Sequence, residues 1–152
     1  MTMTLDTVTD EQKTMFAERV AKHDSETPGY GEQWQAWRET LIAAGGQEAC
    51  PPLSPEEDLP LLLTRSQYWP GKGARKVKGA PSQCHWNVAT LYDDAAIDSI
   101  VTGYALSDDG LWRQHSWGLK DGRIVETTTR RDAYVGYVLT EDECDDFIYW
   151  NA

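Results

Sequence analysis

Two Asp-Gly pairs in the C-terminal half constrain the fold more than any other feature of the chain. Asp109-Gly110 and Asp121-Gly122 lie between segments that are rich in β-branched and aromatic residues. Asp-Gly between such segments is the strongest short-range signal for a β-hairpin, because these residues tolerate the left-handed backbone of a tight turn. The segments span residues 97–107, 111–119, 123–129 and 133–139. We therefore predict a four-stranded antiparallel meander.

The first 45 residues carry helical signals instead. Thr9 with Gln12 three residues later is the pattern of a capping box, which predicts a helix over 9–23. Apolar residues then recur at helical spacing over 31–44, and Gly45-Gly46 is a typical helix end. Helices come first and strands follow, so the pattern predicts an α+β fold with segregated elements.

The middle of the chain is predicted to lead into a central helix. Residues 46–81 are rich in proline and glycine, which favours an extended connection. Ser82 can cap a helix that carries Cys84 and runs to about residue 93, and Thr140 can cap a short acidic helix at the C-terminus. A chain of 152 residues fits a single domain, with parts 1–45, 46–81 and 82–152.

Charge and composition exclude some functions. The net charge of −11 argues against direct nucleic-acid binding, since that affinity comes mainly from lysine and arginine. No apolar run approaches the length of a membrane helix. The start of the chain, Met1–Leu5, has no basic segment followed by an apolar one, and the three cysteines cannot all pair. We therefore expect a cytoplasmic protein that keeps its thiols reduced.

The positive charge is clustered just before the central helix. Lysines and arginines concentrate within residues 72–78, and Arg130 and Arg131 form a second pair. Ordinary solvated charge explains these groups most simply. Alternatively, the first cluster forms an anion site for the Cys84 region, with Arg75 as a candidate substrate-binding residue. A third interpretation gives the role to the acidic surface, which would imitate nucleic acid for a basic protein partner.

Cys84 is the candidate nucleophile. Near a helix N-terminus, free N–H groups and the positive end of the helix dipole stabilise a thiolate, which is the form that attacks carbonyl carbon. The same N–H groups, helped by the Gln83 amide, could receive the oxyanion. Two alternatives remain: a small buried hydrophobe at a helix start, or a metal ligand.

His115 and Glu126 are the candidate partners of this thiol. If Asp121-Gly122 is a two-residue turn, His115 faces Thr128 and is a diagonal neighbour of Glu126, with Cα atoms about 7–8 Å apart. The carboxylate could then accept the ring N–H and leave the other ring nitrogen for Cys84. The alternatives are a half-buried strand histidine bonded to a carbonyl and a solvated glutamate.

Several neighbours are candidates for lining the site. By the same register argument, Trp117 lies opposite Glu126, and a two-residue turn at Asp109-Gly110 would place Tyr104 opposite His115 on the same face. Asn87 follows Cys84 by three residues on its side of the helix. For the aromatic residues, a place in the core is the simpler interpretation. We predict substrate-binding positions at Trp117, Tyr104, Asn87 and Thr128.

The order of Cys84 at a helix start, His115 on a strand and Glu126 on the next strand resembles the papain-like superfamily. Within it, the order is most similar to the transglutaminase-like, arylamine-acetyltransferase-like and NlpC/P60-like branches, over residues 80–140. The resemblance implies thiol-mediated acyl chemistry on an amide or ester. The leading hypothesis is therefore a thiol-protease-like hydrolase or an acyltransferase that uses a small-molecule or peptide substrate and needs no metal or other cofactor.

Three competing hypotheses come from other classes. A metal site built on Cys84, His85 and His115 is disfavoured, because adjacent helical residues point about 100° apart and no Cys-x-x-Cys or similar spacing is present. A noncatalytic acidic protein could bind a basic partner through Glu56–Asp58 and Glu141–Asp146. A small-ligand module could use the tryptophans.

Overall fold

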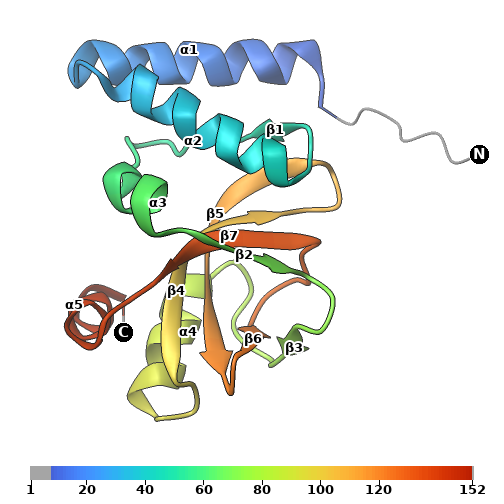
Figure 1. Ribbon diagram of the computed structural model, residues 1–152, viewed down its shortest axis with the longest axis vertical. Coiled ribbons are helices and arrows are strands. Elements are labelled where there is room, and N and C mark those ends of the chain that lie inside the picture. Colours follow the sequence, from blue (N-terminus) through green and yellow to red (C-terminus); the bar gives the residue numbers. More distant parts are fainter. Residues whose placement is uncertain (1–7, 152) are drawn as a thin grey trace, which may run out of the picture.

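The computed structural model describes residues 8–151 (Figure 1). The Met1–Leu5 stretch, which bore on the expected localisation, lies outside these residues. The α+β fold class is confirmed: helices lie around a curled sheet that is largely antiparallel. Helices α1 and α2 lie together at the top of the view, whereas α4 and α5 lie lower, beside β4 (Figure 1).

The first two helices begin and end close to the predicted residues. α1 (Asp10–Glu26) has the predicted capping box: the Gln12 N–H donates to Thr9 Oγ1 at 3.1 Å, and the Thr9 N–H donates to Gln12 Oε1 at 2.9 Å. α2 (Tyr30–Ala44) ends at Gly45 and Gly46, whose φ angles of 136° and 74° favour glycine. The last helix, α5 (Glu141–Asn151), starts after a capping box of Thr140 and Glu143.

The sheet has the strand order β2-β7-β4-β5-β6-β3, and a short strand β1 pairs with β5 off this path. The chain passes through β4, β5 and β6 as the predicted meander, but β7 then returns to pair with β4 instead of β6. β6 is only four residues long and is flanked by β5 and β3, so the chain leaves the sheet there and crosses back to β4. The bounds are β1 (Glu48–Ala49), β2 (Gln67–Pro70), β3 (Arg75–Lys76), β4 (Ser99–Leu106), β5 (Leu111–Lys120), β6 (Arg123–Glu126) and β7 (Ala133–Val138).

The two hairpins differ in register. The β5–β6 register is the predicted one, with Leu119 opposite Ile124. In the β4–β5 hairpin the prediction is wrong by one residue: Gly103, not Tyr104, lies opposite His115. The reason is a longer turn, in which the Ser107 N–H donates to the Leu111 carbonyl. Tyr104 therefore lies on the opposite face of the sheet from His115.

The proline-rich connection is more structured than predicted. It contributes β1, a helix α3 (Leu59–Arg65) and both edge strands of the sheet, β2 and β3. Leu59 and Leu62 are buried, because α3 turns one apolar side toward α2 and β7. Residues 46–81 thus complete the sheet that carries the candidate site.

The two faces of the sheet hold different cores. The Tyr104 face joins the helices in a large cluster that includes Trp37, Leu41 and Trp112. The His115 face holds a smaller cluster of Val101, Ala105, Trp117, Ile124 and Tyr134. Across residues 8–151, no helix combines the length and apolar character needed to cross a bilayer.

Candidate functional site

Cys84 is the first residue of α4 (Cys84–Asp93), which packs against β5 and α5. The predicted Ser82 cap is wrong: Gln83 is the N-cap residue, its side chain makes no capping hydrogen bond, and Ser82 has a φ angle of +58°. The first bond of the helix runs from the Asn87 N–H to the Gln83 carbonyl. The N–H groups of the first turn are therefore available around the thiol, together with the exposed Gln83 amide.

The loop before Cys84 is fixed by Asn87. The Asn87 amide accepts from the Ala80 N–H at 3.0 Å, donates to the Ala80 carbonyl at 2.9 Å and donates to Thr127 Oγ1 at 3.2 Å. Gly79 leaves no room for a side chain, since an added Cβ would lie 2.5 Å from the Asn87 amide nitrogen. This bracing displaces the helix start by one residue from the prediction. Asn87 therefore positions the Cys84 loop through these three hydrogen bonds.

The thiol lies at a gap in the edge of β5. On this edge β5 pairs with β1 at Leu111 and Trp112 and with β6 from Gly118 onward. Within the described part of the chain, residues 113–117 have no strand partner there. The Ser116 N–H faces the gap and helps to lower the pKa of the Cys84 thiol. A strand edge thereby helps to stabilise the thiolate.

Beside the thiol lies a buried His115–Glu126 pair. His115 Nε2 lies 2.8 Å from Glu126 Oε1, and the exposed fractions of the two side chains are 4% and 0%. This contact leaves Nδ1 of the ring free to face Cys84, which lies close enough to His115 for the two groups to shift each other's pKa. The structure therefore places Cys84, which was selected from its place at a helix start, near His115 and Glu126, which the strand register selected.

Glu126 is held by donors on both oxygens. Tyr134 donates its hydroxyl to Oε1 at 2.8 Å, and Thr128 donates its N–H at 2.9 Å and its hydroxyl at 3.1 Å to Oε2. Burial alone would raise the pKa of this carboxyl, but the hydrogen bond and the charge of His115 lower it to about 2, helped by Thr128 and Tyr134. Glu126 is therefore ionised at neutral pH and can orient the imidazole.

Cys84 and His115 shift each other's pKa toward the charged pair. Burial raises the pKa of the Cys84 thiol, but hydrogen bonding to His115, the ring charge and the Ser116 N–H outweigh it, and the pKa lies below its usual range. Burial lowers the pKa of His115, but Cys84 and Glu126 outweigh it and raise the pKa overall. The arrangement favours a thiolate beside an imidazolium.

The aromatic candidates lie deeper than predicted. Trp117 is fully buried and stacks on His115, with ring centroids 6.0 Å apart and planes 25° apart. Tyr104 lies on the far face, where its hydroxyl donates to Glu56 at 2.9 Å and its ring packs on Trp37. Trp117 therefore supports the imidazole within the core, and Tyr104 belongs to a separate network.

His85 and Tyr134 also contribute to the site, through contacts that the sequence did not indicate. His85 Nδ1 lies 2.7 Å from the Ser116 hydroxyl, which in turn donates to Thr102. Burial and the charge of His115 lower the pKa of His85, so this second ring is neutral when His115 is charged. Tyr134 was also missed as a donor to Glu126. Adjacency to Cys84 was the available signal for His85; no local signal pointed to Tyr134.

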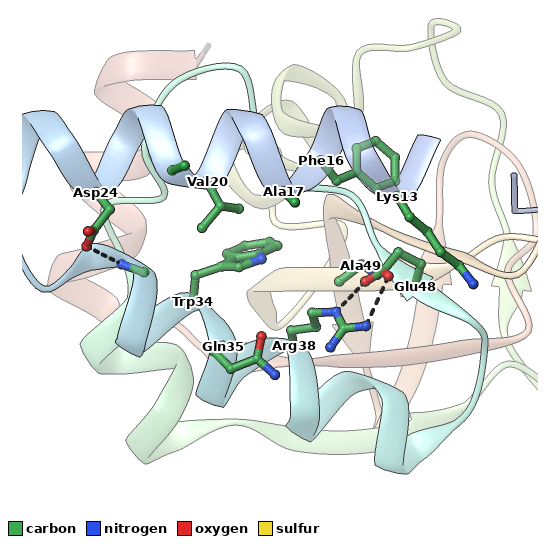
Figure 2. Close-up of a pocket in the computed structure, with 12 residues that line it drawn as sticks. Lys13, Phe16, Ala17, Val20, Asp24, Trp34, Gln35, Arg38, Glu48 and Ala49 are labelled. Carbon is green, nitrogen blue, oxygen red and sulfur yellow. Dashed lines mark hydrogen bonds and ion pairs between the residues drawn. The ribbon is translucent and has the colours of Figure 1, made fainter. Parts of the chain in front are cut away.

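The remaining candidate groups lie elsewhere. Cys50 is half-buried, and Cys144 is buried with its pKa raised by burial. Among residues 8–151, no group of three histidine, cysteine or acidic side chains is arranged to hold a metal ion. A cavity of about 490 Å³ between α1 and α2 contains Trp34 and the Arg38–Glu48 ion pair and none of the Cys84, His115 and Glu126 side chains (Figure 2).

No protein-family model matches the chain, and no curated protein or solved structure matches it either. The residues of the site and their contacts are therefore what indicates its chemistry.

Proposed function

We propose that the protein is a cysteine-dependent hydrolase or acyltransferase that acts on an amide or ester through Cys84, His115 and Glu126. The observation that carries this proposal is the thiol at a helix start beside a buried imidazole, which is itself bonded to an ionised carboxylate. The chain order of these residues, which resembles the papain-like superfamily, supports the same proposal.

The proposed reaction has two steps. The Cys84 thiolate forms a bond to the carbonyl carbon, and the oxyanion is stabilised by N–H groups of the first turn of α4 with the Gln83 amide. The carbon–nitrogen or carbon–oxygen bond then breaks, and the leaving group takes the Nδ1 proton of His115. Water or an acceptor returns a proton to Nδ1, attacks the thioester and releases the thiolate.

The other side chains of the site have supporting roles in this scheme. Glu126 keeps His115 in the tautomer and orientation that leave Nδ1 for Cys84. Thr128, Tyr134 and Trp117 hold the carboxylate and the ring in place. The three free cysteines support a reducing compartment, and we place the reaction in the cytoplasm.

Thiol alkylation tests the proposal without knowledge of the substrate. At pH 6 an ordinary thiol with a pKa of about 8.5 is almost fully protonated, whereas a lowered pKa leaves a larger thiolate fraction. We expect iodoacetamide to label Cys84 at least ten times faster than Cys50, measured by peptide mass spectrometry over time. His115→Ala should abolish most of this difference.

Cys50 in the same sample is the internal control for reagent and pH. If Cys84 reacts no faster than Cys50, the activated thiol is refuted. The noncatalytic alternative, an acidic surface that binds a basic partner, would then be favoured.

A further inference from the structure

A pocket of about 650 Å³ adjoins the candidate site on the side of Glu126. Its walls come from three segments that the fold brings together: the end of β3 and the residues after it, the loop before Cys84, and the residues that follow Glu126. The lining residues are Lys76, Lys78, Gly79, Pro81, Ser82 and Thr127–Thr129.

The two lysines are held on one side of their strand. The Val77 N–H donates to the Glu126 carbonyl at 2.8 Å, so the segment continues alongside β6 past the end of β3. Side chains alternate in extended backbone, and Val77 packs toward the large core cluster. Lys76 and Lys78 are thus both directed away from that core, and both line the pocket.

The pocket is positively charged although the chain is acidic overall. Two lysines and three threonines line it, and no carboxylate among residues 8–151 does. The nearest buried carboxylate, Glu126, already accepts hydrogen bonds from His115, Tyr134 and Thr128. Arg75, the residue selected from the sequence, precedes the lining residues and is exposed.

The cavity next to His85 on the other side of the site has the opposite charge. It is lined by Glu57, Asp58, Glu143 and Asp146, of which Glu143 is paired with Arg65. Ser82, two residues before Cys84, thus lines a basic pocket, whereas His85, the residue after Cys84, lines an acidic one.

We propose that the Lys76–Lys78 pocket binds an anionic group of the substrate, a carboxylate or a phosphate, through the two ammonium groups and the Thr129 hydroxyl. This inference rests on the proposed function, because it makes the pocket a substrate subsite beside Cys84. It assigns substrate selection to Lys76 and Lys78 instead of Arg75.

Two alkylating reagents, one neutral and one anionic, measure the electrostatic effect of this pocket on reactions at the Cys84 sulfur. Iodoacetate and iodoacetamide react by the same displacement of iodide, but only iodoacetate is an anion. A nearby positive charge raises the local concentration of the anion and so its rate. We expect the ratio of the iodoacetate rate to the iodoacetamide rate at Cys84 to fall at least threefold in Lys76→Ala/Lys78→Ala.

The matched control is Lys13→Ala/Lys22→Ala on α1, which removes the same net charge far from the pocket. We expect the ratio to change less than 1.5-fold in this variant. A second arm adds glutarate or inorganic phosphate to the wild-type protein. Either anion should slow the iodoacetamide reaction at Cys84, and the one that acts at lower concentration identifies the group as carboxylate or phosphate.

An unchanged ratio in the Lys76/Lys78 variant, or no slowing by either anion, would overturn the subsite. The iodoacetamide rate alone reports the proposed function, since a Cys84 that reacts no faster than Cys50 refutes the activated thiol whatever the ratio. A fast Cys84 with an unchanged ratio refutes only the subsite. The two failures are therefore distinguishable in one experiment.

Discussion

Glu126 and Glu56 are both buried carboxylates that a tyrosine hydroxyl contacts, yet they lie in opposite electrostatic settings. Glu126 accepts from His115 and Tyr134, and its pKa is lowered to about 2. Glu56 accepts from Tyr104 and from Gln114, both of them neutral donors. Burial raises the pKa of Glu56, and its hydrogen bonds do not cancel that effect.

The comparison shows what a cationic partner adds to a buried acid. Neutral donors satisfy the oxygens of Glu56 but leave its negative charge poorly solvated. The imidazolium beside Glu126 compensates the charge itself, and the pKa moves in the other direction. Only the Glu126 network is therefore suited to holding a charged histidine next to a thiolate, whereas the Glu56 network fixes helices to the sheet.

The largest expected effect concerns stability against pH. Glu126 has a folded-state pKa of about 2 against an ordinary 4.5, so its ionised form stabilises the fold above pH 4.5, by about 3 kcal/mol. That contribution is lost as the pH falls from 4.5 to 2. We expect the difference in unfolding free energy between wild type and Glu126→Gln to shrink over this range, measured by urea denaturation.

Glu56→Gln should show the opposite slope. The raised pKa of Glu56 means that its contribution is fully present below its ordinary pKa and is lost as the pH rises through the folded-state value. The wild type should therefore lose stability relative to Glu56→Gln as the pH rises above 4.5. The same sign of slope for both variants would refute the contrast.

A smaller effect is expected on the thiol. Glu126→Gln removes the charge that supports the imidazolium. It also removes the repulsion by which Glu126 raises the pKa of Cys84, but this is the smallest of the contributions, and the loss of the imidazolium outweighs it, so the pKa of Cys84 rises. One pKa unit lowers the thiolate fraction tenfold at pH 6. We expect at least a tenfold slower iodoacetamide reaction of Cys84. Glu56→Gln, which acts on the other face, should change the rate less than twofold and is the matched control.

The smallest effect comes from the two tyrosines. Tyr134→Phe removes one of four hydrogen bonds to Glu126 and should slow Cys84 alkylation by about two- to threefold, since the remaining donors keep the carboxylate ionised. Tyr104→Phe removes the matching hydroxyl from Glu56 and should leave the rate unchanged. Equal effects of the two changes would mean that the networks are not separate.

The two Asp-Gly pairs explain how far the sequence could predict the site. At Asp121-Gly122 both residues have positive φ angles, 51° and 75°, as the assumed two-residue turn requires, and the His115–Glu126 register follows from it. Asp109-Gly110 forms a longer turn because the Asp109 carboxylate accepts from the Leu111 N–H and from Arg113. The same dipeptide therefore gave one correct register and one wrong one.

The rest of the site depends on contacts between distant segments. Tyr134 reaches Glu126 only because β7 pairs with β4, and no hairpin signal specifies that return. Asn87 moves the start of α4 by binding Ala80 and Thr127, a contact that helix-capping patterns do not report. Local turn chemistry thus located the histidine and the acid, whereas long-range packing decides how they are held.

Two glycines lie in line with His115 across three neighbouring strands. Gly136 pairs with Gly103, and Gly103 pairs with His115. A methyl group on Gly136 would lie 2.8 Å from the Trp117 ring, and one on Gly103 would collide with the β7 backbone. The Trp117 indole occupies the space beside Gly136 that a methyl group there would take, and it stacks on the His115 imidazole. The His115 imidazole is buried against this indole, so in the proposed reaction we expect the motion to fall to the sulfur and to the loop that precedes it.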